Sequence, residues 1–158
     1  MRDANSTFSI RLANVQDVPE VAVLSRDLIE NGLGWSWTEA RVARCLRERN
    51  TNVAVAHGQG VVQGFAIMRY TDDEAHLLLL AVRAGFQRRG VGGALVSWVE
   101  KPARLAGIAC IHLEARSANT AARAFYAKQG YEEVALARGY YSGRESAVRL
   151  AKSLRPDA

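Results

Sequence analysis

The stretch LLLLAVRAGFQRRGVGG, residues 77–93, decides both the predicted fold and the candidate site. Its apolar start is typical of a strand in the middle of a sheet, its loop carries Arg83, Arg88 and Arg89, and its glycines open a helix. The first amides of a helix have no partner within the helix, and the helix dipole adds about half a positive charge at that end. Because glycine has no Cβ, a ligand can approach this backbone closely. The stretch therefore predicts an anion site, and its arginines favour a pyrophosphate.

Two familiar phosphate-binding loops do not fit this stretch. A Walker loop ends in Gly-Lys-Ser or Gly-Lys-Thr, whereas residues 90–95 read GVGGAL. A dinucleotide fingerprint needs a third glycine, which is missing in register here, although Glu114 lies at a distance that would suit the acid of that motif. A third pattern, Gln/Arg-x-x-Gly-x-Gly/Ala after an apolar strand, matches Gln87 to Gly92.

The segments on either side predict an α/β fold with a mixed sheet. Alternating or continuous apolar runs predict strands at 8–12, 52–56, 61–70, 75–82, 108–115, 132–140 and 145–150. Helical spacing predicts helices over 14–28, 38–49, 90–106 and from 119 to about 129, with Asp17 expected to cap the first. Helices come early, a hairpin follows, and strand and helix then alternate. Parallel and antiparallel pairs are both expected, in a single domain over residues 1–158.

Composition narrows the class of protein. The chain has 158 residues, a formal net charge of +5 and no run of five like charges, which does not favour nucleic-acid binding but suits a polyanionic cofactor. Cys45 and Cys110 show no metal-ligand spacing, and neither do the histidines, so no metal is predicted. Free thiols favour a cytoplasmic location. The longest apolar run, 77–82, is too short for a membrane span, and no signal peptide is recognisable.

The loop and the segments after it resemble the GNAT superfamily of acyltransferases. The matching segments follow in order: QRRGVG at 87–92, LEARSAN at 113–119, AFY at 124–126 and GY at 130–131. Within the superfamily the sequence is most similar to the ribosomal-protein N-terminal alanine acetyltransferases, through residues 113–131, RGYY at 138–141, GRE at 143–145 and Trp35-Ser36. The resemblance implies a twisted sheet of six to seven strands, parallel at its centre and flanked by about four helices.

The resemblance also implies acetyl-CoA as co-substrate. Amides from Gln87 to Gly92 would hold the pyrophosphate, and the backbone around Leu80 to Val82 would bind the pantetheine arm like an added strand. Asn119 would cap a helix and touch the same arm. The alternative is that residues 87–93 only form the glycine-rich start of a helix and bind no ligand. The implied coenzyme-binding residues are Leu80, Ala81, Val82, Gln87, Arg88, Arg89, Gly90, Val91, Gly92, Gly93, Asn119 and Tyr126.

Glu114 is the implied general base. In strand geometry it shares one face with His112 and Arg116, and the alternative is a surface glutamate paired with Arg116. An amine must lose a proton before it attacks a thioester. At pH 7 this costs about 1 kcal/mol for a protein α-amine but over about 4 kcal/mol for a lysine, so one carboxylate suits the α-amine better.

Tyr126 is the implied general acid, which would protonate or hydrogen-bond the departing thiolate. The alternative is a core aromatic residue with its hydroxyl at the surface. A second alternative mechanism uses Cys110 as a nucleophile that forms an acyl-enzyme, with His112 on the same side of the strand.

The acceptor is the least specified part. Tyr140 and Tyr141 on a hairpin, with Trp35 and Trp37 opposite, would wall the acceptor site, or they are ordinary packing residues. Only Ser142 separates Tyr141 from Gly143, a shorter turn than those enzymes usually have. The predicted function is direct acetyl transfer to a protein N-terminal α-amine. Alternatives are a small-molecule amine such as an amino acid, polyamine or drug, a coenzyme-binding module without catalysis, and a transferase directed to nucleic acid. A monomer or homodimer is expected.

Overall fold

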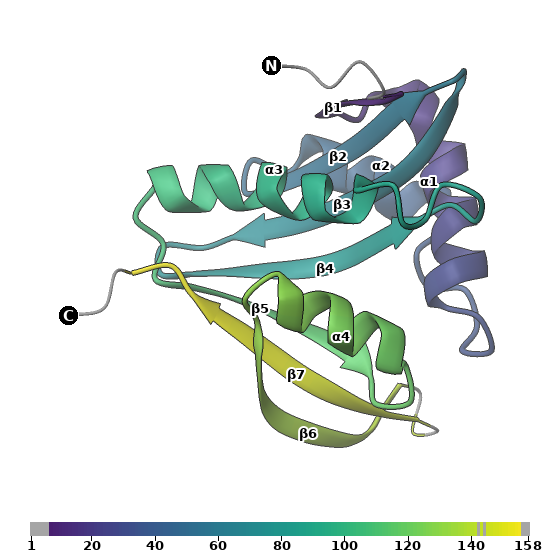
Figure 1. Ribbon diagram of the computed structural model, residues 1–158. Coiled ribbons are helices and arrows are strands. Elements are labelled where there is room, and N and C mark those ends of the chain that lie inside the picture. Colours follow the sequence, from purple (N-terminus) through teal and green to yellow (C-terminus); the bar gives the residue numbers. More distant parts are fainter. Residues whose placement is uncertain (1–6, 142, 144, 156–158) are drawn as a thin grey trace. The chain divides into compact units, whose positions relative to one another are not determined.

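The computed structural model describes residues 7–141, 143 and 145–155. Within these residues seven strands form one hydrogen-bonded sheet in the order β1-β2-β3-β4-β5-β7-β6 (Figure 1). The strands are β1 (Ser9–Leu12), β2 (Thr51–Gly58), β3 (Val61–Tyr70), β4 (Glu74–Val82), β5 (Cys110–Arg116), β6 (Glu132–Tyr141) and β7 (Glu145–Ser153). The shortened turn predicted at Ser142, and Arg144 of the GRE segment, lie outside the described residues.

Four α-helices accompany the sheet in the described part of the chain: α1 (Val18–Leu24), α2 (Glu39–Arg47), α3 (Val91–Leu105) and α4 (Thr120–Lys128). The predicted helix over 14–28 changes type along its length, from a 3₁₀ turn (Val15–Asp17) through α1 to a π-helical turn (Ser25–Ile29). Asp17 was expected to cap this helix, but its side chain makes no capping hydrogen bond to α1. Asn14 caps the 3₁₀ turn instead, and the Asp17 carboxylate accepts from the Asn14 amide and pairs with Arg11.

The centre of the sheet is parallel, as predicted. β4 and β5 run parallel in a register from Glu74–Cys110 to His76–His112. β5 is antiparallel to β7, and β6 pairs antiparallel with β7 through an irregular register. The predicted mixed α/β fold with a parallel centre is confirmed.

The chain divides into two compact units, which are described separately. The first contains residues 7–68 and Leu79–Val99, and the second contains Arg69–Leu78 and residues 100–155. The prediction of a single domain therefore stays a prediction. Among the described helices, none combines the length and the apolar character that a bilayer span requires.

The first unit is built around two strands that are buried along most of their length. In β2 and β3 consecutive residues on both faces are buried, among them Val53, Val55, Phe65 and Ile67. Figure 1 shows why, since α1 and α2 lie on one face of β1–β3 and α3 lies on the other. A strand covered on both faces has a nearly continuous apolar sequence, as β2 and β3 do over most of their length.

Gly64 lets α3 lie directly on the sheet. A Cβ at this position would come within 2.8 Å of the carbonyl oxygen of Ala81 and within 3.2 Å of the side chains of Val91 and Leu95. Val91 and Leu95 belong to the first turns of α3, and both are buried. The absence of a side chain at Gly64 therefore sets how closely the start of α3 approaches β3 and β4.

The second unit contains β5–β7, α4 and the end of α3. Along β5 the side chains of Ile111, Leu113 and Ala115 are buried, while residues 112, 114 and 116 are less buried and lie on the other face. This alternation was expected from strand geometry. Glu100 at the end of α3 is almost fully buried and accepts hydrogen bonds from Tyr131 and Lys152.

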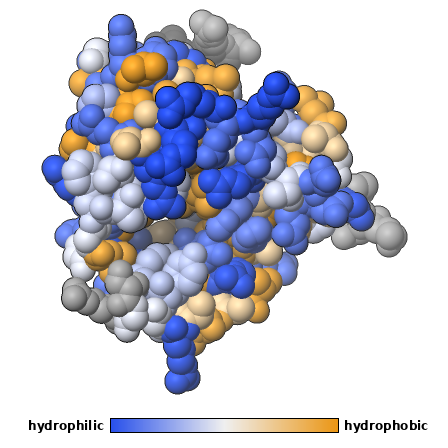
Figure 2. All heavy atoms as spheres, turned by 180° about the vertical axis from the view of Figure 1, so that it is seen from behind, coloured by the Kyte–Doolittle hydropathy of each residue, from blue (hydrophilic) through white to orange (hydrophobic). Residues whose placement is uncertain are grey.

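The surface carries its apolar residues in scattered positions. Figure 2 shows hydrophobic residues on one face mostly in small groups between hydrophilic ones. The large apolar side chains that are exposed among the described residues are Leu12, Val15, Val23, Leu28, Trp35, Leu105, Val134, Leu136 and Tyr140.

Replacing Gly64 with alanine should destabilise the protein. The added Cβ meets a backbone oxygen, which cannot move away as a flexible side chain can, so the free energy of unfolding should fall by about 1–3 kcal/mol. Urea denaturation followed by circular dichroism measures this. Ser97→Ala, an exposed change on α3, is the control and should stay within about 0.5 kcal/mol of wild type. An unchanged midpoint for Gly64→Ala would show that the helix has room to move.

Candidate active site

The predicted anion site lies where α3 begins. The carbonyl of Gly90 accepts a hydrogen bond from the amide of Ala94 at 3.0 Å, so the helix proper starts at Val91. Residues 87–90 are exposed, whereas Val91 is buried. The amides before the helix are therefore open to solvent at the positive end of its dipole, in the arrangement that binds anions.

The backbone of this loop is held in an uncommon conformation. Arg88 has φ of 64° and Gly90 has φ of 82°. A non-glycine residue rarely adopts the left-handed region, and such strain is found most often at functional sites. The conformation at Arg88 thus supports a ligand-binding role for the loop.

The loop arginines divide into two groups. Arg83 turns back onto the first unit, where its Nε donates to the Val62 carbonyl at 2.9 Å and its Nη2 lies 3.0 Å from Glu20. Arg88 and Arg89 are exposed, and the guanidinium of Arg89 lies 5.5 Å from the Phe86 ring. Arg88 and Arg89 can therefore supply positive charge to an anion, whereas Arg83 is already paired with Glu20.

The residues expected to hold the pantetheine arm end β4. Ala81 is buried, with Leu80 and Val82 partly exposed. The Val82 carbonyl accepts a hydrogen bond from the side-chain amide of Gln87 at 3.3 Å. Gln87 therefore connects the end of the strand with the start of the glycine-containing loop.

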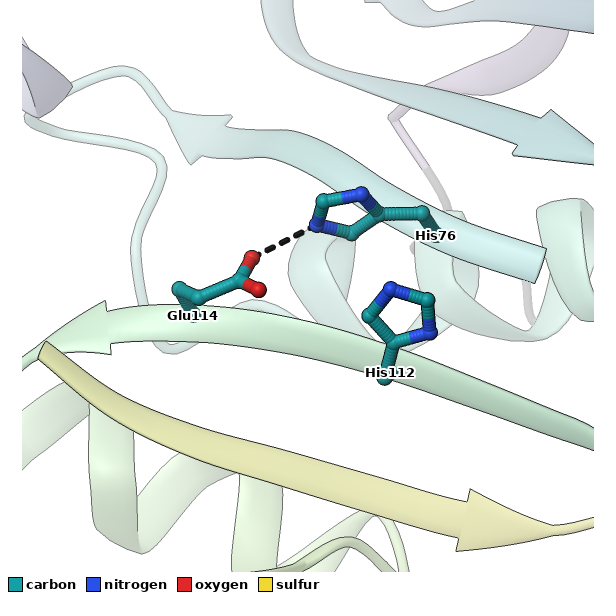
Figure 3. A group of neighbouring side chains, drawn as sticks. All are labelled: His76, His112 and Glu114. Carbon is teal, nitrogen blue, oxygen red and sulfur yellow. Dashed lines mark hydrogen bonds and ion pairs between the residues drawn. The ribbon is translucent and has the colours of Figure 1, made fainter. Parts of the chain in front are cut away.

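Glu114 lies at the centre of a charged network in the second unit (Figure 3). Its Oε2 is 2.6 Å from Nε2 of His76 on β4, and its Oε1 accepts from Nε of Arg149 on β7 at 3.2 Å. The side chain of Glu114 is only 8% exposed. Burial acts to raise the pKa of Glu114, but the hydrogen bonds from His76 and Arg149 and the positive charge of Arg149 outweigh burial, so the pKa lies below its ordinary value. The carboxylate is ionised at neutral pH.

The expected alternative pairing of Glu114 is wrong. Arg116 lies 3.6 Å from Glu145 rather than beside Glu114. The partners of Glu114 come from the neighbouring strands β4 and β7, because β5 pairs with both of them. Sequence reasoning missed His76 and Arg149, since neither is near Glu114 in the chain.

His112 completes this cluster. Its ring stacks on the ring of His76, with centroids 4.3 Å apart and planes inclined by 24°. The two residues are direct partners in the parallel register of β4 and β5. Burial is the largest cause that acts on the pKa of His112, and it lowers this pKa. His112 is therefore neutral at physiological pH.

The cluster has the donor set of a metal site but not its arrangement. Ligand atoms of His76, His112 and Glu114 lie within 4.8 Å of one another. An imidazole binds a metal ion in the plane of its ring, and two stacked rings direct their nitrogens into separate planes. Both carboxylate oxygens are also engaged, one of them by the cation Arg149. The geometry favours a hydrogen-bonded network.

Tyr126, the expected general acid, is a buried residue of α4. It is 8% exposed, and its ring meets Phe125 and Tyr131 edge-on with centroids 5.2 and 5.9 Å away. Burial raises the pKa of Tyr126, so the hydroxyl keeps its proton.

Asn119 caps α4, since its side chain accepts a hydrogen bond from the Ala122 amide at 3.0 Å. The cap role of Asn119 is confirmed, and the coenzyme contacts of Asn119 and Tyr126 stay predictions.

Trp35 and Trp37 differ in exposure. Trp37 is 7% exposed and lies under the guanidinium of Arg41, whereas Trp35 is 42% exposed and lines a surface pocket of about 470 Å³. Glu30, which the sequence analysis did not single out, holds the backbone at Ser36 and Trp37 through hydrogen bonds. Its Oε1 accepts from the amide and hydroxyl of Ser36, and its Oε2 accepts from the Trp37 amide at 3.1 Å.

Tyr140 and Tyr141 lie at the end of β6. Their rings meet edge-on at 4.9 Å, and Tyr140 is exposed. Burial, followed by the charges of Tyr140 and Glu114, raises the pKa of Tyr141 to about 12. Burial, followed by the charge of Glu114, also raises the pKa of Tyr140. The two tyrosines are thus associated with Glu114 within the second unit.

Cys110 does not have the properties of a nucleophile. Burial, followed by the charge of Glu74, raises the pKa of its thiol. A reactive cysteine needs a lowered pKa, because the thiolate is the nucleophile. The structure therefore gives the acyl-enzyme alternative no support.

Comparison with known proteins assigns the family. The model of the acetyltransferase (GNAT) family matches residues 22–131. The ribosomal protein bS18-alanine N-acetyltransferase of Escherichia coli is 36% identical over 118 residues, which are 73% of this chain and 79% of that protein.

Solved structures agree with this assignment. Ard1 from Thermoplasma volcanium superposes with a TM-score of 0.83 and 28% identity, over 95% of this chain and 99% of that one. A ribosomal-protein-alanine N-acetyltransferase structure from Escherichia coli gives 0.81 and 27%, over 96% of each chain. This chain belongs to the acetyltransferase (GNAT) family, and acetyl-CoA is its co-substrate.

Proposed function

We propose that this acetyltransferase transfers the acetyl group of acetyl-CoA to the N-terminal α-amine of a protein. The exposed amides where α3 begins carry the proposal for the donor side. The similarity to the bS18-alanine N-acetyltransferase, at 36% identity over most of both chains, supports a ribosomal protein beginning with alanine as acceptor.

On the donor side, each part of the coenzyme has a counterpart in the chain. The amides of Gln87 to Gly92 hold the pyrophosphate, and Arg88 and Arg89 add charge. The backbone from Leu80 to Val82 takes the pantetheine arm. Gly93, Asn119 and Tyr126 complete the proposed coenzyme contacts.

The proposed reaction is a direct transfer. The neutral amine attacks the thioester carbonyl, a C–N bond forms, and the C–S bond breaks. Glu114 aids removal of the amine proton, and Tyr126 supplies or shares a proton with the departing thiolate. The carboxylate of Glu114 is ionised and Tyr126 keeps its proton, as these two roles require.

Other acceptors receive less support. The structures of nourseothricin acetyltransferase and aminoglycoside 6'-N-acetyltransferase are 20% and 18% identical to this chain, so they show the fold alone. Several relatives over 30% identical to this chain are bS18-alanine N-acetyltransferases. We expect Trp35, Trp37, Tyr140 and Tyr141 to contact the acceptor, and we expect a cytoplasmic monomer or homodimer.

Charge reversal at Arg88 should weaken coenzyme binding. Loss of a charge-assisted contact costs about 1.5–3 kcal/mol, so Arg88→Glu should raise the Kd for coenzyme A by about 10- to 100-fold in calorimetry. Arg49→Glu makes the same change of net charge at an exposed residue after α2 and should leave the affinity nearly unchanged. Equal losses in both variants would assign the effect to net charge rather than to the loop.

A panel of acceptors should separate the amine classes. At pH 7 an alanine-initiated peptide should react about 10²-fold faster than a lysine side chain in an N-terminally blocked peptide, because its amine is deprotonated at lower cost. Thiol release from acetyl-CoA measures the rate. The control is a peptide that is blocked at its N-terminus and contains no lysine, so it offers no acceptor amine. A preference for lysine or for a small amine would contradict the proposed acceptor.

A further inference from the structure

We propose that His76 is the group that accepts the proton of the acceptor amine, and that Glu114 positions His76 for this task. The inference rests on the proposed function and refines its base. The observation behind it is the hydrogen bond of 2.6 Å between Nε2 of His76 and Oε2 of Glu114 (Figure 3).

Exposure separates the two residues. The side chain of Glu114 is 8% exposed, and both of its oxygens are engaged, one by His76 and one by Arg149. The side chain of His76 is 29% exposed. A group that takes a proton from an incoming amine must come within hydrogen-bond reach of it. His76 meets this requirement better than the enclosed carboxylate.

The carboxylate fixes the tautomer of His76. An ionised carboxylate only accepts hydrogen bonds, so Nε2 of a neutral His76 carries the hydrogen that is donated to Glu114. The lone pair then lies on Nδ1. Figure 3 shows this second nitrogen on the edge of the ring that does not face Glu114. Within the described residues no hydrogen bond occupies Nδ1.

The protons balance over His76 and the leaving group. The ammonium form of the acceptor gives one proton to Nδ1 of His76, which becomes an imidazolium, and the neutral amine then attacks the thioester. The attacking nitrogen loses a second proton when the amide forms, and this loss is matched by the proton that the departing thiolate gains through Tyr126. Glu114 stabilises the imidazolium charge without taking the proton, as in other carboxylate–histidine pairs. The partly exposed ring later releases the proton to water.

Acidity also favours an imidazole. Ordinary imidazoles titrate at about 6.5 and α-amines at about 7.7–8, whereas an ordinary glutamate titrates at about 4.3. A base works best when its pKa lies near the working pH. Because the pKa of Glu114 is lowered further, Glu114 alone is a poor acceptor for this proton.

Besides Glu114, titratable groups on four strands lie near the cluster of His76 and His112. β4 contributes Glu74. The other titratable groups near the cluster are His112 on β5, Arg149 on β7, and Tyr140 and Tyr141 on β6. His112 is neutral at physiological pH because its pKa is lowered, so it does not compete for the proton.

His76→Gln tests the assignment. Glutamine can keep a donor to Glu114 but has no titratable nitrogen. We expect kcat/KM with an alanine-initiated peptide to fall by about 10²- to 10⁴-fold and the acidic limb of its pH profile to disappear. The affinity for coenzyme A should not change. His57→Gln on β2 removes a histidine elsewhere and should keep the wild-type profile.

Two further variants separate catalysis from structure. Added imidazole should restore part of the activity of His76→Ala, which a purely structural residue would not allow. Glu114→Gln still accepts from Nε2 but lacks the charge, so we expect a smaller loss and an acidic limb at lower pH. Full activity of His76→Gln, together with an inactive Glu114→Gln, would overturn the proposal.

Nitrogen NMR of the wild-type histidines tests the pair without any acceptor. We expect the Nε2-protonated tautomer for His76, with the lone pair on Nδ1. The Nδ1-protonated tautomer would overturn the inference. If the expected tautomer is found but no peptide in the panel causes thiol release, the proposed function fails, while the assignment of the lone pair to Nδ1 of His76 stands.

Discussion

The register of β5 against its neighbours is the constraint on which the candidate active site depends. Its antiparallel ladder with β7 sets Glu114 opposite Arg149, and its parallel ladder with β4 sets His112 beside His76. Side chains alternate between the faces of a strand, so a shift of one residue would turn Glu114 toward the core. The charged network is thus a product of strand pairing rather than of local sequence.

A different constraint shapes the loop from Gln87 to Gly90, the proposed coenzyme site. There the decisive features are backbone conformation and close packing, with Arg88 in the left-handed region and α3 held against the sheet over Gly64. The loop offers main-chain amides, whose direction is fixed by the fold, while the Glu114 network offers side chains that can exchange protons. Group transfer needs both kinds of site: one for a polyanionic donor and one for an amine.

The sequence predicts most of the fold because hydrophobic periodicity and glycine positions are local signals. The strand–loop–helix junction at 77–93 and the alternation along β5 follow directly from them. The 3₁₀ and π segments around α1 were not predicted, because a change of helix type leaves little trace in apolar spacing. Glu114, Tyr126 and Asn119 became candidate site residues through ordered motifs, and their roles stay predictions. His76, Arg149 and Glu30 were missed, since their partners are set by pairing between strands or by loop closure.

The left-handed residues before α3 affect how tightly a ligand can be held. A loop that becomes ordered only on contact loses conformational entropy at that moment, and affinity falls accordingly. Here the strand–loop–helix junction itself sets the left-handed angles of Arg88 and Gly90. Where the fold sets a loop conformation in this way, the cost of ordering is incurred during folding, so the proposed attraction between amides and diphosphate can appear almost entirely as affinity.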